Sequence, residues 1–203
     1  MTRDTLREER RQQILAAATA VFARSGFHKA SMNDIVKESG LSKGGLYWHF
    51  KSKDDIIAAV LEQFFNQEMA LLNELAAADL SAVERLHLLT QGILNDLQSM
   101  SEFLPISLEF YALAARHEGT RKFMRSYYRQ YGETLAWLVQ QGIDAGEFRP
   151  IGSAQQTAAS LIAQFEGVML LWVLDPEAFD LSQQLEASVS LLLRGMQAGE
   201  TAA

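Results

Sequence analysis

The chain has 203 residues, of which 48% are hydrophobic, and it carries a net charge of -7. This composition suits a globular protein and excludes an intrinsically disordered chain. The sequence has no cysteine, which excludes disulfides and thiolate metal sites, and no apolar run reaches the roughly 18 residues of a membrane span. The charged N-terminal stretch lacks the apolar segment of a signal peptide, so we expect a cytoplasmic protein without a membrane segment.

The charge is unevenly distributed along the chain. Residues 1–53 hold ten Lys or Arg against five Asp or Glu, a net charge of +5. The remaining 150 residues hold eight against twenty, a net charge of -12. A basic head on an acidic body is expected when one end of a protein meets phosphate, although charge alone leaves chance clustering open.

Apolar residues recur every three or four positions and strand signals are nearly absent, which predicts an all-α chain. The first helix ends at Ser25-Gly26, and a capping box at Ser31–Asp34 opens a short second helix. Ser42 caps a third helix that ends near Phe50. A second capping box, Ser52–Asp55, opens a long helix that runs to about Ala78. Further helices are predicted at about 81–99, 102–116, 119–145, 152–174 and 180–198, for about nine in total.

Residues 31–50 have the form of a helix-turn-helix motif, because two short helices are joined by a tight turn containing Gly40. In such a motif the second helix enters the major groove of DNA. The predicted interior anchors of this motif are Ile35, Val36, Leu41, Leu46 and Phe50, packing on Val21 and Phe22. Gly44 and Gly45 lie in the first turn of the second helix, where each costs about 1 kcal/mol relative to alanine in a helix interior. Their missing Cβ atoms would let the backbone approach DNA closely.

The stretch MNDIVKESGLSKGGLYWHFKSK (residues 32–53) resembles the DNA-binding signature of the TetR family of bacterial transcriptional regulators. The segments ILAAA (residues 14–18) and FARSGF (residues 22–27) extend the resemblance, which covers about residues 8–65. The remainder resembles the family only in length and helical character. The resemblance implies a three-helix DNA-binding domain at residues 1–52 and a larger helical ligand-binding and dimerisation domain at 53–203. It also implies a regulator and not an enzyme.

The resemblance nominates residues for DNA contact at the start of the second helix, in the third helix and at the start of the fourth. These are Ser31, Asn33, Ser42, Lys43, Gly44, Gly45, Tyr47, Trp48, His49 and Lys53. We expect Lys43 to reach a guanine edge or a phosphate, and Tyr47 and His49 to bond phosphate. The chain departs from the family pattern at two positions, where Asn33 often is Arg and Gly45 often is Thr, Ala or Ser. Trp48 occupies a variable position, so it either stacks on the DNA or lies on the domain surface.

The resemblance also implies a homodimer formed by the last two helices, at about 152–174 and 180–198, and a pocket for a small, largely apolar effector. Candidate pocket residues are Phe65, Leu94, Asn95, Phe103, Glu109, Phe110, Tyr111, Tyr128, Gln164 and Phe165. For each aromatic in this set, ordinary core packing is the alternative. No cofactor is expected, and no metal, because His49 has no partner at ligand spacing.

We therefore expect a ligand-responsive homodimeric repressor that binds a palindromic operator and is released by an effector. The alternative is an architectural or interaction protein of the same fold without an effector, which a filled core with no cavity would favour. An enzyme with a phosphate loop at SKGG is disfavoured, because Lys43 precedes both glycines and no strand leads into them.

Overall fold

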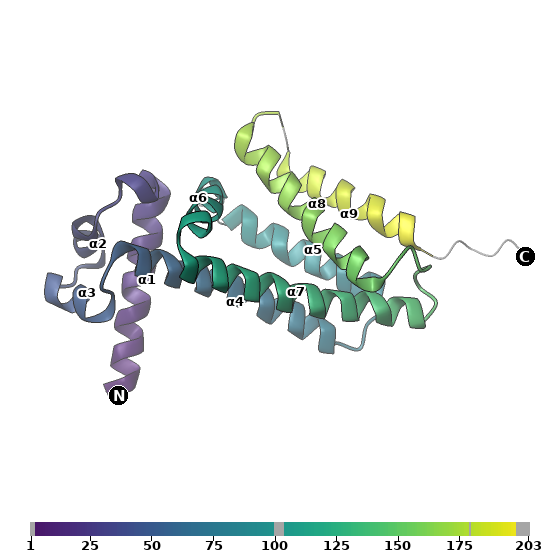
Figure 1. Ribbon diagram of the computed structural model, residues 1–203, viewed down its shortest axis with the longest axis horizontal. Coiled ribbons are helices and arrows are strands. Elements are labelled where there is room, and N and C mark those ends of the chain that lie inside the picture. The colour runs from purple at the N-terminus through teal and green to yellow at the C-terminus, as the bar shows by residue number, and fades with distance from the viewer. Residues whose placement is uncertain (1–2, 100–103, 179, 198–203) are drawn as a thin grey trace, which may run out of the picture. The chain divides into compact units, whose positions relative to one another are not determined.

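The computed structural model describes residues 3–99, 104–178 and 180–197 (Figure 1). Over these residues it contains nine α-helices and no strand, which confirms the predicted all-α fold. The chain divides into two compact units. Two long helices, α4 (Lys53–Ala77) and α7 (Glu118–Asp144), contribute residues to both units.

The first unit contains three N-terminal helices, the first part of α4, and a helix from the middle of the chain. These helices are α1 (Arg3–Lys29), α2 (Met32–Ser39), α3 (Lys43–His49), α4 up to Asn66, and α6 (Leu104–Arg116). The regular geometry of α1 is interrupted at Gly26, where φ is 68° and ψ is 165°, so the chain turns at the predicted helix end. A positive φ of this kind favours glycine, because it lacks a Cβ atom.

Both predicted capping boxes are present in the first unit. The Ser31 hydroxyl accepts the Asp34 N–H at 3.3 Å, and the Asp34 carboxylate accepts the Ser31 N–H at 3.0 Å. Ser52 and Asp55 make the equivalent pair at 3.1 and 3.0 Å. These reciprocal bonds satisfy backbone donors that a helix start leaves unpaired, so they determine where α2 and α4 begin.

The second unit contains the remaining parts of α4 and α7 together with three further helices. These are α5 (Ala82–Ser99), α8 (Ala154–Leu174) and α9 (Leu181–Met196). Figure 1 shows α8 and α9 running side by side, and the two helices contact each other along their length. The side chains of Leu72, Leu138, Leu185 and Leu193 are fully buried and form the centre of this unit's core.

The helix α8 is apolar but poorly covered. It is the one described helix that is long and apolar enough to cross a membrane, with a mean hydropathy of 1.6, yet only 17% of its apolar window is buried. Three of its leucines are 44, 47 and 68% exposed, namely Leu170, Leu171 and Leu174. Leu191 of α9 is 71% exposed. Large apolar surfaces of this kind mark contacts with a partner or a membrane.

Candidate nucleic-acid interface and ligand cavity

The turn between α2 and α3 is fastened to α1. Gly40 adopts left-handed geometry at φ 67° and ψ 8° and ends α2. The Gln13 side-chain amide, on α1, donates to the backbone oxygen of Ser39 at 2.7 Å. Because glycine ends a helix in this conformation at no steric cost, the turn takes one defined geometry and places α3 at a set angle to α2.

The buried side of α3 consists of the predicted apolar anchors. Leu46 is completely buried and Phe50 is 6% exposed, and Ile35 of α2 is also completely buried. Val36 and Leu41 are only half-buried, so they contribute less to this interior than the sequence suggested. Burying a Leu or Phe side chain stabilises a fold by about 1.5–3 kcal/mol, which holds the opposite side of α3 outward.

The outward side of α3 begins with the paired glycines. The Ser42 hydroxyl accepts the Gly45 N–H at 3.1 Å and so caps the helix. A Cβ atom added at Gly44 would meet nothing within 4 Å, whereas one added at Gly45 would lie 3.3 Å from the Ser42 hydroxyl oxygen. The space beside the Gly44 Cα atom is therefore empty in the isolated chain, and only a bound partner would contact a side chain at this position.

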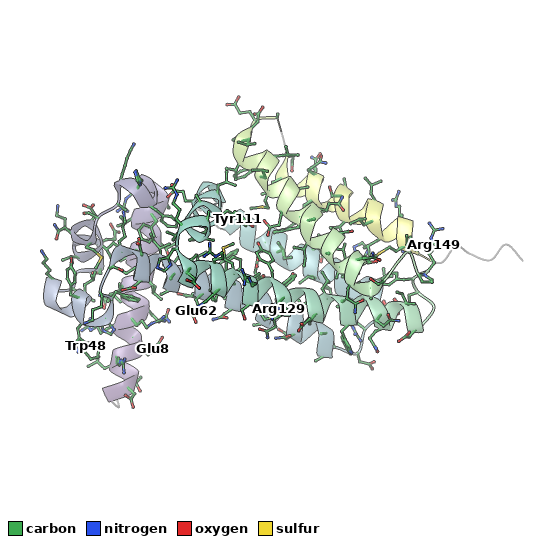
Figure 2. The ribbon with its side chains drawn as sticks, in the orientation of Figure 1. Glu8, Trp48, Glu62, Tyr111, Arg129 and Arg149 are labelled. Carbon is green, nitrogen blue, oxygen red and sulfur yellow. The ribbon has the colours of Figure 1, made fainter. Side chains whose placement is uncertain are left out.

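Two aromatic side chains extend this surface. Tyr47 is 37% exposed and Trp48 is 61% exposed. The guanidinium carbon of Arg7 lies 5.3 Å from the centre of the Trp48 ring. Figure 2 shows Trp48 beside the N-terminal half of α1, where Glu8 also lies. A cation over a tryptophan ring is attractive, so Arg7 helps to hold Trp48 in place on the surface.

His49 lies at the end of α3 and is half-buried. Burial lowers the pKa of its imidazole below the ordinary value, and the nearby positive charges of Arg7 and Arg11 lower this pKa further. The imidazole is therefore mostly uncharged at neutral pH. A phosphate placed next to it would favour the charged form and reverse this shift.

Lys53 has a structural role that its sequence position does not reveal. Its ammonium group donates to the backbone oxygen of Phe27 and, at 3.0 Å, to that of Ala30, and the side chain is half-buried. Carbonyl groups at a helix end lack intrahelical partners, so the charge of Lys53 ties the end of α1 to the start of α4. Because the partners lie 26 and 23 residues away, no local sequence signal could have identified this contact.

All ten residues nominated for DNA contact belong to the first unit. The exposed ones are Ser31, Asn33, Ser42, Lys43, Gly44, Tyr47 and Trp48. The half-buried ones are Gly45, His49 and Lys53. The structure thus brings together a small, polar and basic surface on α3 and around the starts of α2 and α4.

The second unit contains a cavity of about 70 Å³ whose lining comes from α4, α5, α7, α8 and α9. Six of the lining side chains are polar: Glu68, Thr90, Tyr127, Tyr128, Tyr131 and Glu166. The other lining residues are Leu, Ile, Val or Phe. An apolar wall with a few placed polar groups is typical of a small-molecule site.

Only Tyr128 and Phe165 of the ten predicted pocket residues line this cavity. Phe65, Leu94 and Phe110 are buried in the core. Asn95 and Tyr111 are exposed, Gln164 is half-buried outside the lining, and Phe103 lies outside the described residues. Helical periodicity identified the apolar faces of the helices. It does not indicate at which position along the helix axes the packing leaves a cavity.

Glu109 belongs to the first unit. Its carboxylate accepts the backbone N–H of Phe27 at 3.0 Å, directly after the break at Gly26. It also lines a separate cavity of about 380 Å³ within that unit, together with Lys53 and Arg116. Glu109 therefore holds α6 to α1. The carboxylates that line the cavity of the second unit are instead Glu68 and Glu166, which the sequence analysis did not identify.

The chain is similar to known regulators over both units. Residues 14–60 match bacterial regulatory proteins of the tetR family, and residues 82–195 match the C-terminal region of BetI-type transcriptional repressors. The HTH-type transcriptional regulator UidR of Escherichia coli (strain K12) is 30% identical over 192 residues, which cover 93% of this chain and 91% of UidR.

Solved structures are similar in fold. A TetR transcription regulator from Haloarcula marismortui superposes with a TM-score of 0.82 at 21% identity, over 94% of this chain and all of that one. The regulator FadR from Bacillus subtilis, solved in complex with stearoyl-CoA, gives a TM-score of 0.77 at 22% identity over 91% and 98% of the two chains. At these identities the structures establish the fold alone.

Proposed function

We propose that this chain, which belongs to the TetR family of bacterial transcriptional regulators, is a cytoplasmic homodimeric repressor released from a palindromic operator by a small-molecule effector. The family consists of DNA-binding regulators and not of enzymes. The observation that carries the proposal is the outward side of α3, where glycines, Lys43 and exposed aromatics are held by the buried Leu46 and Phe50. We assign DNA binding to residues 1–52, and ligand binding and dimerisation to residues 53–203.

In this proposal α3 enters the major groove, and the surrounding residues position it on phosphate. Lys43 reads a base edge or a phosphate, and Tyr47 and His49 bond phosphate. Trp48 is exposed and therefore available to stack on sugar or a thymine methyl. Because phosphate contacts release counterions, affinity should fall steeply with salt.

The test is a fluorescence anisotropy titration against operator sequences obtained by in vitro selection. Lys43→Ala should weaken the selected operator at least about tenfold and reduce its advantage over random DNA. Lys122→Ala, an exposed lysine on α7, is the charge-matched control and should bind as the unmodified chain does. Selection that yields no consensus sequence, or equal binding by both variants, would contradict the proposed recognition role of α3.

We assign dimerisation to α8 and α9 because the residues that the structure describes leave several of their leucines exposed. A dimer would bury this surface, and it would also present two α3 helices to successive major grooves about 34 Å apart or a multiple of that distance. Apolar surface is worth about 25 cal/mol per Å² removed from water, which favours burial of Leu174 and Leu191 against a second copy.

Analytical ultracentrifugation tests this assignment. Leu191→Glu should convert the dimer to a monomer at micromolar concentration, because it would bury a charge in the interface. Leu88→Glu, at a leucine of α5 that is 42% exposed, is the matched control and should remain dimeric. A dimer that tolerates Leu191→Glu would place the interface elsewhere.

The cavity of the second unit supports the ligand-responsive proposal over the architectural alternative, which predicted a filled core. An effector can shift a conformational equilibrium only by its differential affinity for the two states. Since α4 and α7 contribute residues to both units, we propose that they carry this shift. If operator affinity does not change with any ligand that binds in the cavity, the proposed release by an effector is refuted, while the DNA-binding assignment stands.

A further inference from the structure

The charged side chains that line the cavity of the second unit are all acidic. Its described lining contains the carboxylates of Glu68 and Glu166 and no lysine, arginine or histidine. Apart from Thr90, the remaining surface is aliphatic or aromatic, with the rings of three tyrosines and of Phe165. Such a lining repels an anion, because a carboxylate or phosphate on a ligand would meet like charges in an apolar surrounding.

Most hydroxyl hydrogens in the cavity are already donated within the protein. The Tyr127 hydroxyl donates to Glu68 at 2.6 Å, and the Tyr128 hydroxyl donates to Glu166. The Thr90 hydroxyl donates to the backbone oxygen of Leu86 at 2.8 Å. Each of these oxygens, and each carboxylate, has capacity to accept more than one hydrogen bond. The cavity therefore offers a ligand mainly acceptors.

Tyr131 is the exception. It lines the cavity, is only 8% exposed, and its hydroxyl has no hydrogen-bond partner among the residues that the structure describes. Burial raises the pKa of Tyr131 well above its usual range, and the charges of Glu68 and Glu166 raise it further, so the hydroxyl stays protonated and neutral. Within the described residues Arg85 Nε is the one fully buried side-chain nitrogen or oxygen without a partner, so the Tyr131 hydroxyl is accessible from the cavity, where water or a ligand can accept its hydrogen.

We propose that this cavity binds a protonated organic amine with an apolar body. The ammonium group, which carries only donors, bonds the carboxylates of Glu68 and Glu166. The surrounding aromatic rings attract the cation and cover the apolar body. The amine site itself is argued from the cavity alone. That the bound amine acts as the effector rests on the proposed function.

The size of the cavity agrees with an ammonium head group. Its volume of about 70 Å³ is several times the roughly 10–15 Å³ that a single water needs. It is smaller than the roughly 150 Å³ of an apolar cavity that holds benzene. The enclosed part therefore suits the ammonium head group, and a compact apolar body such as one phenyl ring lies against the aliphatic and aromatic part of the lining.

The first experiment compares three benzyl compounds by calorimetric and NMR titration of the full chain without DNA. Benzylammonium should bind at least about tenfold more tightly than the neutral benzyl alcohol, because only the cation gains the charge-assisted bonds. Benzoate should show no saturable binding. The proposal is overturned if benzyl alcohol or benzoate binds as tightly as benzylammonium, or if benzylammonium does not saturate the protein.

Variants then locate the site. Glu166→Gln and Glu68→Gln remove one charge each and keep an oxygen that accepts the tyrosine hydroxyl, so the fold should be retained. Each should weaken benzylammonium at least about tenfold and leave benzyl alcohol unchanged. Glu133→Gln, an exposed residue of α7 outside the lining, is the control for net charge. Unchanged benzylammonium affinity in both cavity variants, with thermal unfolding as in the unmodified chain, overturns the proposal.

Operator titrations separate this inference from the proposed function. If benzylammonium saturates the cavity and leaves operator affinity unchanged, the amine site stands and effector release is refuted. If a neutral or anionic compound releases the operator while benzylammonium does not bind, the repressor function stands and the amine site is refuted.

Discussion

Gly44→Ala should stabilise the free protein and weaken operator binding at the same time. The backbone at Gly44 does not have a positive φ, and an added Cβ atom meets nothing within 4 Å. Alanine lowers the entropy of the unfolded chain and favours the helix, so a gain of about 0.4–1 kcal/mol is expected in the free energy of unfolding. For a chain of this length the gain corresponds to a rise of roughly 1–4 °C in Tm.

The same methyl group should interfere with DNA. If the first turn of α3 approaches a groove closely, the added Cβ prevents that approach, and operator affinity should fall at least about tenfold, which corresponds to about 1.4 kcal/mol. Gly45→Ala should stabilise the free protein less, because its Cβ would lie 3.3 Å from the Ser42 hydroxyl oxygen. The two positions therefore differ in how much the free energy of unfolding rises when the glycine is replaced by alanine.

Thermal unfolding followed by circular dichroism, together with anisotropy titration of the operator, measures both effects. Gly132→Ala on α7 is the matched control, because its Cβ would make only an ordinary contact with Ile162 at 3.8 Å. It should stabilise without changing DNA binding. A Gly44→Ala variant that is more stable and binds the operator normally would show that this turn does not face DNA, and a destabilised variant would refute the conformational argument.

Three further predictions concern the first unit. Glu109→Ala should lower the free energy of unfolding by about 1–3 kcal/mol in urea titrations, because it leaves the Phe27 N–H without its acceptor, whereas the exposed Glu62→Ala should not. Lys53→Ala should weaken operator binding and also lower stability by about 1–3 kcal/mol, and an unchanged urea midpoint would contradict its role at the end of α1. Since the pKa of His49 is lowered in the folded chain, the unfolded chain binds the proton more readily, and stability should fall as the pH drops below about 6.5. Operator affinity should instead rise on acidification if phosphate favours the imidazolium, and His49→Gln should remove that part of the pH dependence.

The sequence by itself determined the features that depend on near neighbours. The capping boxes at Ser31 and Ser52 join residues three apart, and the left-handed turn at Gly40 depends on the absence of a single Cβ atom. The spacing of Leu46 and Phe50 predicted the buried side of α3 correctly, because one helical period relates the two positions. These local relations were enough to predict the helices, the motif and the family.

Only the tertiary structure decided which distant groups meet. Lys53 bonds carbonyl oxygens more than twenty residues away, and the cavity takes Glu68, Tyr131 and Glu166 from three helices. A helix turns by about 100° per residue, so a small change in its rotation or level exchanges a core position for a cavity wall. Periodicity therefore identified Phe65 and Leu94 as apolar and inward-facing, whereas the packing of five helices determined that the space opened beside Tyr131 instead.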